Sequence, residues 1–159
     1  MYENHLPIFG VGPYLVLIIG IITIIFSISS YYHLIPVYKI NELNMVFFIL
    51  GVILISLGIV FWISAVLVSK ISDEVENNKL VTTGIYAYVR HPIYAAFFYA
   101  ATGLILISQN ILLFILPVFF WAFLTVAMIN TEEKWLIERY SDDYRDYSKK
   151  VNRFIPKVI

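Results

Sequence analysis

Long apolar runs separated by short polar segments dominate this chain. The runs at 14–31, 45–68, 92–108 and 111–130 are each about as long as the roughly 20 residues that an α-helix needs to cross about 30 Å of hydrocarbon. Gly and Ser interrupt the second run, but membrane helices tolerate small residues because these let neighbouring helices approach. We therefore predict four membrane-spanning helices.

Polar and turn-forming residues predict where these helices begin and end. His91 precedes Pro92, and proline suits the first turn of a helix because its missing N–H is not needed there, so His91 is the expected N-cap of the third span. Gln109 and Asn110 form the next turn, and so short a connection makes the third and fourth spans antiparallel neighbours. Pro117 is expected to kink the fourth span.

The C-terminal part changes character after Thr131, becoming charged and rich in tyrosine. It predicts one helix from Glu132 to Tyr140 and another around Asp142 to Lys149. The tail also carries a group of aromatic and basic residues that could bind anionic lipid headgroups at the membrane surface. This group comprises Tyr144, Tyr147, Lys149, Lys150 and Arg153.

Composition supports one membrane domain. Of the 159 residues, 60% are hydrophobic and 14% are charged, which is far from a typical soluble domain. The apolar runs must pack on each other, so residues 1–159 are predicted to form a single all-α, polytopic membrane helix bundle with a helical C-terminal tail. The chain has no cysteine, and its histidines, at positions 5, 33 and 91, are too scattered for a recognisable metal-binding spacing, so no metal site is expected.

Basic residues predict the orientation. Three of the eleven Lys and Arg residues lie within 69–91 and seven follow Asn130, whereas 32–43 contains only Lys39. Because basic loops stay on the cytoplasmic side, we expect a multi-pass protein of the cell membrane with both termini cytoplasmic. Membrane lipids are expected partners, and nucleic acid is not.

Candidate chemistry gathers where the third span begins and the fourth ends. Because the two spans form a hairpin, residues equally far from its turn lie at similar depth, so His91 and Tyr94 should face the two glutamates. The start of a helix suits a carboxylate or phosphate, whereas the glutamates suit a cation, so a zwitterion would fit. The residues that this argument assembles are Tyr86, Arg90, His91, Tyr94, Glu132 and Glu133.

Each of these residues also has an ordinary explanation. An arginine at a span boundary often snorkels to the interface or sets topology, and tyrosines are common there. The two glutamates fit the solvated first turn of a surface helix. Spacing alone leaves these explanations open.

Two blocks of sequence resemble the isoprenylcysteine carboxyl methyltransferases and the related phospholipid methyltransferases. The first block is LVTTGIYAYVRHPIY, at 80–94. The second contains Thr131-Glu132-Glu133, Tyr140, Asp143-Tyr144, Tyr147 and the residues 151–156. The resemblance covers about 79–156, half of the chain, and preserves the spacing across an intervening membrane hairpin.

The resemblance implies an S-adenosylmethionine-dependent membrane methyltransferase whose cofactor site lies within 79–156 and is built from helix ends and loops. No Gly-x-Gly-x-x-Gly fingerprint is present. The cofactor's carboxylate would lie on the His91 side and its ammonium near Glu132. The candidate cofactor-binding residues, from the resemblance and the hairpin argument together, are Leu80, Val81, Tyr86, Arg90, His91, Pro92, Ile93, Tyr94, Glu132 and Glu133.

The resemblance implies a lipidic or prenylated acceptor, most directly the carboxylate of an isoprenylcysteine-like substrate. Some eukaryotic members have a basic residue four positions before the glutamate that matches Glu132, but this chain has Met128 there, so the acceptor class stays open. No catalytic residue is assigned, because a carboxylate needs no base, whereas an amine would use Glu132 or Glu133. Two alternatives are a sterol-type reductase using NADPH, which has a similar C-terminal hairpin, and a small membrane scaffold without enzymatic activity.

Overall fold

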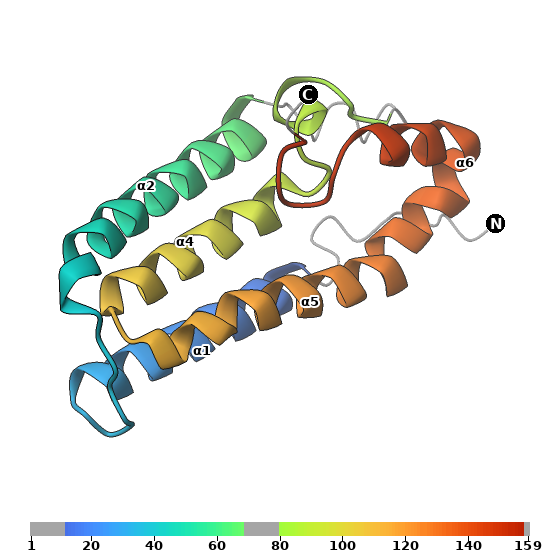
Figure 1. Cartoon of the computed structure of the whole chain (residues 1–159). Coiled ribbons are helices and arrows are strands. Elements are labelled where there is room, and N and C mark those ends of the chain that lie inside the picture. Colours follow the sequence, from blue (N-terminus) through green and yellow to red (C-terminus); the bar gives the residue numbers. More distant parts are fainter. Residues whose placement is uncertain (1–11, 69–79, 158–159) are drawn as a thin grey trace.

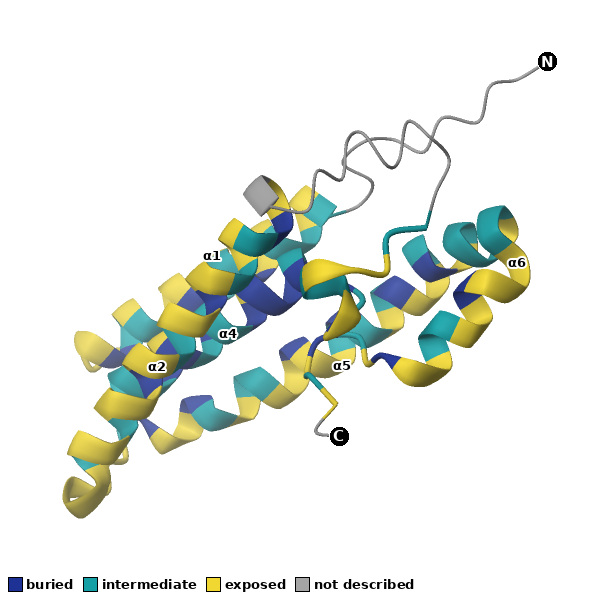
Figure 2. Ribbon diagram, turned by 90° about the horizontal axis from the view of Figure 1, so that it is seen from above, coloured by how far each residue is buried: buried dark blue, intermediate teal, exposed yellow. Residues whose placement is uncertain are grey.

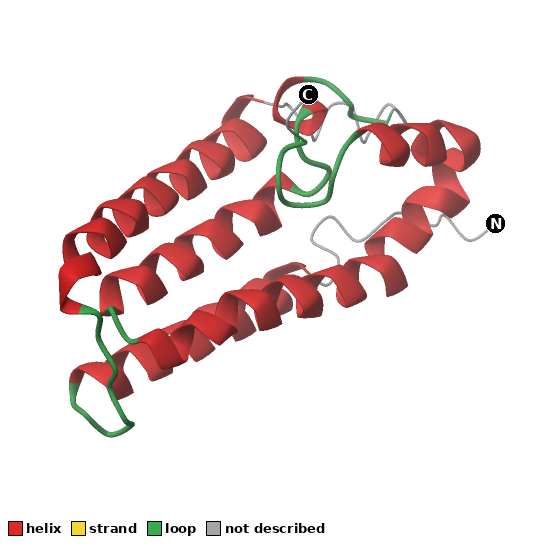
Figure 3. Cartoon of the chain, in the orientation of Figure 1, coloured by secondary structure: helices red, strands yellow, loops and turns green. Residues whose placement is uncertain are grey.

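The computed structural model describes residues 12–68 and 80–157, and within these ranges it contains helices and no strand (Figures 1 and 3). A single isolated parallel bridge joins Val89 and Asn152. The predicted all-α class is therefore confirmed. The α-helices are α1 (Gly12–Tyr31), α2 (Asn44–Ile63), α4 (Pro92–Ser108), α5 (Ile115–Asn130) and α6 (Glu132–Lys150).

Short turns of other helix types connect or extend these helices. A π-helical turn continues α2 to the end of the predicted second span, and a 3-10 turn precedes α5. The π-helical turn is Ser64–Val68, and the 3-10 turns are Asn41–Leu43, Gly84–Ala87 and Ile111–Phe114.

Three of the predicted spans correspond to helical segments long and apolar enough to cross a membrane, namely Gly12–Tyr31, Asn41–Val66 and Ile111–Asn130. The predicted third span is the apolar helix α4, which has only 17 residues. At 1.5 Å per residue it rises about 25 Å, a few ångströms less than the hydrocarbon thickness. By length, the structure therefore supports three of the four spans.

Helix α4 lies inside the bundle, with α2 on one side and α1 on another (Figure 1), and it packs most extensively on α2. Glycines make this contact close. A Cβ atom placed on Gly51 would lie 2.7 Å from the carbonyl oxygen of Gly103, and one on Gly58 would lie 2.7 Å from that of Ala96. The outer faces of α1 and α2 are largely exposed and apolar, as expected of surfaces that meet lipid (Figure 2).

The turn between α4 and α5 agrees with the sequence prediction. Gln109 ends α4 in the left-handed conformation, with φ of 56°, and α5 then returns antiparallel to α4 (Figure 1). Asn110 is fully buried, and its amide donates to the Ser30 hydroxyl at 3.1 Å and to the Pro36 carbonyl at 3.0 Å. This side chain therefore ties the connection after α1 to the turn.

Three further predictions about helix starts and breaks can be compared with the structure. Pro117 lies in the first turn of α5, where its missing N–H is not needed, and the 3-10 turn Ile111–Phe114 leads directly into this helix. The predicted break in the tail is confirmed, because Ser141 has non-helical φ and ψ of 47° and −116° inside α6. His91 is the N-cap residue of α4 as predicted, but its side chain makes no capping hydrogen bond.

Candidate functional site

The starts of α4 and α6 meet the end of the chain at one place. The residues 151–156, here called the C-terminal strap, run beside the segment that leads into α4. The backbone N–H of Arg90 donates to the Asn152 carbonyl at 2.8 Å, and that of His91 donates to the Arg153 carbonyl at 3.0 Å. These two bonds fix the strap against the start of α4.

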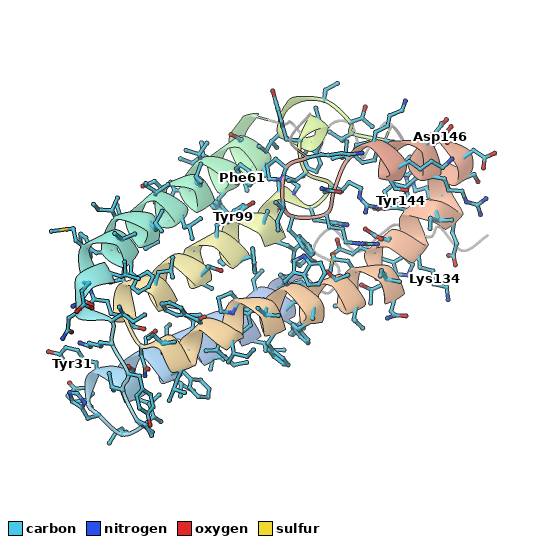
Figure 4. The ribbon with its side chains drawn as sticks, in the orientation of Figure 1. Tyr31, Phe61, Tyr99, Lys134, Tyr144 and Asp146 are labelled. Atoms are coloured by element: carbon cyan, nitrogen blue, oxygen red, sulfur yellow. The ribbon has the colours of Figure 1, made fainter. Side chains whose placement is uncertain are left out.

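Aromatic side chains contact the strap and the loop that lies before α4. Phe154 is almost wholly buried, and its ring centroid lies 6.1 Å from that of His91. The hydroxyl of Tyr99, a residue of α4 labelled in Figure 4, donates to the Phe154 carbonyl at 3.1 Å. The Tyr147 hydroxyl donates to the Tyr86 carbonyl at 2.6 Å, which ties α6 to the preceding loop. Hydrogen bonds and aromatic contacts thus attach the strap to α4 at this end of the bundle.

Glu133 lies at the centre of a buried ion-pair network. Its two carboxylate oxygens accept hydrogen bonds from Nε and Nη2 of Arg153, at 2.9 Å and 2.8 Å. Arg90 Nη1 lies 3.0 Å from Oε1, and His91 Nε2 lies 3.3 Å from the same oxygen. Burial alone would raise the pKa of Glu133, but the hydrogen bonds from His91 and Arg153 and the charge of Arg90 lower it to about 2.

Arg90 continues the network towards α6. Its Nη1 donates to the Tyr144 hydroxyl at 3.3 Å, and its guanidinium lies 5.9 Å from the centroid of that ring. Burial, followed by the nearby charge of Glu133, raises the pKa of Tyr144 to about 12, so the hydroxyl stays protonated. Tyr144 is almost wholly buried and Arg153 pairs with Glu133, so these two residues of the predicted headgroup-binding group have internal partners in the structure.

Glu132 has a different environment from its neighbour. Tyr94 donates a hydrogen bond to Glu132 Oε1, and His91 Nδ1 lies 3.6 Å from Glu132 Oε2. The Glu132 side chain is 23% exposed and that of Glu133 only 7%. His91 therefore lies between the two carboxylates, with one ring nitrogen facing each. Burial alone would lower the pKa of His91, but the two glutamates outweigh burial and raise it.

The structure adds Gly12, which the sequence analysis missed. A Cβ atom on this first residue of α1 would lie 2.8 Å from the Tyr94 hydroxyl oxygen and 3.9 Å from Glu132 Oε1. The start of α1 therefore closes against the two residues, and only glycine fits without a shift. The following Pro13 could have signalled that α1 begins here, before the predicted position 14, but not that it meets α4 and α6.

The other candidate residues are less defined. Leu80, Val81 and Ile93 are half-buried, and Pro92 is buried. Burial, and then the charge of Glu132, raises the pKa of Tyr86. The structure thus joins most of the predicted residues in one cluster, while the predicted loop at 69–91 is described only from Leu80 onward.

The cluster contains a carboxylate that could accept hydrogen bonds from a ligand and backbone N–H groups that could donate them. Glu132 keeps a partly exposed carboxylate, and the first turn of α4 has N–H groups without an intrahelical acceptor. In the described ranges, no group of three or more His, Asp or Glu side chains is arranged to hold a metal ion. Arg90 and Glu133 face each other inside the protein, so these two predicted residues have mainly internal partners.

Comparison with known proteins identifies relatives of this chain. The model of the phospholipid methyltransferase family matches residues 46–143. The protein-S-isoprenylcysteine O-methyltransferase of Schizosaccharomyces pombe is 42% identical over 90 residues, which cover 55% of this chain and 37% of that protein. The enzyme of the same name from Xenopus laevis is 32% identical over 118 residues, covering 69% of this chain and 41% of that protein.

A third relative has a different acceptor in its name. The methanethiol S-methyltransferase 1 of Bradyrhizobium diazoefficiens is 31% identical over 86 residues, covering 54% of this chain and 29% of that protein. The chain thus spans less than half the length of each of these three relatives. The family match runs from α2 into α6 and includes every predicted cofactor-binding residue. The chain therefore belongs to the phospholipid methyltransferase family.

Proposed function

We propose that this chain is an integral membrane methyltransferase that uses S-adenosylmethionine and methylates a lipidic acceptor, most directly the carboxylate of an isoprenylcysteine-like substrate. The names of the relatives support methyl transfer. The observation that carries the proposal is the group of His91, Tyr94 and Glu132, drawn together from α4 and α6.

The residues present fit the cofactor. S-adenosylmethionine supplies a methyl group on a sulfonium, a good leaving group, and it also has an ammonium and a carboxylate. Glu132 would bind the ammonium, because it is the more exposed of the two glutamates. The N–H groups of Ile93 and Tyr94, at the start of α4 beside His91, would hold the carboxylate. Leu80 and Val81, in the preceding loop, would add apolar contacts.

The protein's own contribution is binding, orientation and exclusion of water. A carboxylate or thiolate acceptor needs no general base, whereas an amine would need one. Glu133 is a poor base, since its pKa is about 2 and its oxygens already accept hydrogen bonds from Arg153. Glu132 is the remaining candidate for that role. We accordingly assign Glu133 to the support of the site and Glu132 to the ligand.

A thiol acceptor is the second candidate. Met128, where some relatives carry a basic residue, is fully buried in the core, so the chain presents no positive side chain there to hold a carboxylate. A neutral thiol needs no such charge, although it must give up its proton as the methyl group is transferred, and Glu132 is the candidate base for that proton. One relative is named for methyl transfer to methanethiol. The reductase and scaffold alternatives have no comparable support.

We further propose that residues 1–159 act as one domain, with the cofactor site in 79–156 closed by the start of α1, and that this site faces the cytoplasm. The distribution of basic residues supports the orientation. Contact of Gly12 with Tyr94 supports the single domain, because the first helix then completes a site formed by the last ones.

Ligand-induced thermal stabilisation in detergent tests the cofactor. S-adenosylhomocysteine should raise the melting temperature, and NADP should not. Stabilisation by NADP alone would favour the reductase, and stabilisation by neither would favour the scaffold. Transfer of labelled methyl from S-adenosylmethionine to prenylcysteine, thiol and aminophospholipid acceptors then identifies the acceptor class.

A further inference from the structure

Arg153 contacts the candidate site twice, although it lies some sixty residues after His91 in the sequence. Its guanidinium binds both oxygens of Glu133, at 2.9 Å and 2.8 Å. Its backbone carbonyl accepts the N–H of His91 at 3.0 Å. One residue of the C-terminal strap therefore holds both the carboxylate that faces the His91 ring and the backbone that carries the ring.

The contact between Glu133 and His91 has a chemical consequence. Glu133 pairs with two arginines and, as a carboxylate, acts only as an acceptor, so we assign a proton to His91 Nε2, which lies 3.3 Å away. The variable proton is then the one on Nδ1, which lies 3.6 Å from Glu132 Oε2. When Nδ1 is protonated, His91 points a donor towards Glu132 and competes with a cationic ligand for this carboxylate. When Nδ1 is not protonated, Nδ1 and Glu132 can both act as acceptors for the ligand.

The charges around His91 are nearly balanced. Glu132 and Glu133 face it from α6 and favour the protonated ring, while the Tyr94 ring lies 5.9 Å away on α4. Arg90 precedes it in the chain, and Arg153 reaches the same carboxylate from the strap. Both arginines are positively charged and pair with Glu133, so removal of either should leave the ring facing a larger net negative charge.

We propose that Arg153 is a positioning residue of the cofactor site, which acts through Glu133 to fix the His91 ring and to keep Glu132 available to the ligand. The role rests on the proposed function, since it takes Glu132 as the cofactor contact. Within the described residues, Arg153 forms hydrogen bonds to Glu133 and to the backbone of His91, but none to Glu132 or to the residues of the first turn of α4. Its effect on a ligand is therefore indirect.

The test compares the wild-type protein with Arg153→Gln and Arg153→Lys in detergent. Imidazole ¹⁵N signals report the titration of His91 without any ligand, and variants of His5 and His33 assign the other two histidines. The titration midpoint should rise by about one pH unit in Arg153→Gln, because a neighbouring positive charge is lost. It should rise less in Arg153→Lys, because lysine keeps the charge but cannot bind both oxygens of Glu133 and so compensates the negative charge of that carboxylate less fully.

Calorimetric titration with S-adenosylhomocysteine provides the second measurement. Affinity at pH 7 should fall on the order of ten-fold in Arg153→Gln, because a protonated His91 competes for Glu132. Lys157→Gln removes the same charge from an exposed residue just beyond the strap and should change neither the midpoint nor the affinity. A purely structural role would lower the melting temperature without moving the His91 midpoint.

An unchanged or lowered His91 midpoint in Arg153→Gln overturns the proposal, as does a raised midpoint with unchanged affinity. If Arg153→Gln does not fold, Arg153→Lys decides alone, and a midpoint no higher than that of the wild type overturns the proposal. Failure of S-adenosylhomocysteine to bind the wild-type protein would instead reject the proposed function. In that case the ¹⁵N titration alone would decide whether Arg153 influences His91.

Discussion

Glu132 and Glu133 are adjacent in the sequence but have different partners, and this difference predicts different mutant phenotypes. Glu132→Gln should weaken binding of S-adenosylhomocysteine about ten- to a hundred-fold, because a charge-assisted hydrogen bond is lost, with little change in stability. Glu133→Gln should instead destabilise the fold by about 3 kcal/mol or more, since it leaves Arg90 and Arg153 without their buried partner.

Calorimetric titration and thermal unfolding of both variants separate these effects. Glu138→Gln, at an exposed position on the same helix, serves as the control and should change neither quantity. Equal losses of affinity in folded samples of the two variants would contradict the assignment of the ligand contact to Glu132.

The lowered pKa of Glu133 also predicts a pH dependence of stability. A carboxyl group whose pKa falls from 4.5 to about 2 on folding stabilises the native state fully above about pH 4.5, and this contribution is lost as the pH falls towards 2. The difference in melting temperature between wild type and Glu133→Gln should therefore shrink below pH 4.5. Melting curves between pH 3 and 6 check this. A constant difference over that range would argue that Glu133 is not ionised in the folded protein.

At the scale of helices, the close packing of α2 on α4 depends on residues without side chains. Gly58→Val should destabilise the bundle by about 1 to 3 kcal/mol, because the Cβ atom alone would lie 2.7 Å from the Ala96 carbonyl oxygen, where the backbone cannot yield cheaply. Thermal unfolding in detergent measures the effect.

Gly20→Ala is the matched control, since a Cβ atom on this α1 glycine would meet nothing within 4 Å. It should leave the melting temperature unchanged or raise it slightly, because alanine favours the helix. Equal destabilisation by both variants would show that glycine matters for some reason other than the contact between α2 and α4.

The helices could be predicted from sequence because their signals are local. Apolar runs, Pro92 at a helix start and the turn at Gln109 each act within a few residues. The different partners and burial of Glu132 and Glu133 could not be predicted from spacing alone, since they depend on which of the two neighbours points inward at the start of α6. Arg153 and Gly12 reach the site through tertiary contacts between distant segments, and no local pattern encodes these.

At the scale of the whole molecule, the orientation in the membrane is testable because the chain has no native cysteine. We expect an impermeant thiol reagent to label Asn41→Cys in intact cells and to leave Lys157→Cys unlabelled, since basic residues favour a cytoplasmic C-terminal tail. Both positions are exposed in the structure. Labelling of the second variant in intact cells, with protection of the first, would mean that the bundle is inverted.

The position of the site at one end of an apolar bundle bears on how an acceptor reaches it. Glu132 is the first residue of α6, and only Thr131 separates it from Ile111–Asn130, a helical segment long and apolar enough to cross the membrane. An acceptor with an apolar tail could therefore enter sideways, leaving its tail along the helices while its reactive group meets the cofactor.

Tail length should then control apparent affinity. Each buried CH₂ contributes about 0.8 kcal/mol, so a longer prenyl or acyl tail should lower the apparent Michaelis constant several-fold per carbon until the available surface is covered. The measurement is methyl transfer from labelled S-adenosylmethionine to acceptors that differ only in tail length, at fixed detergent and with partitioning into micelles corrected. A flat response would reject lateral entry and favour a small water-soluble acceptor, such as a short thiol, while leaving the cofactor assignment unchanged.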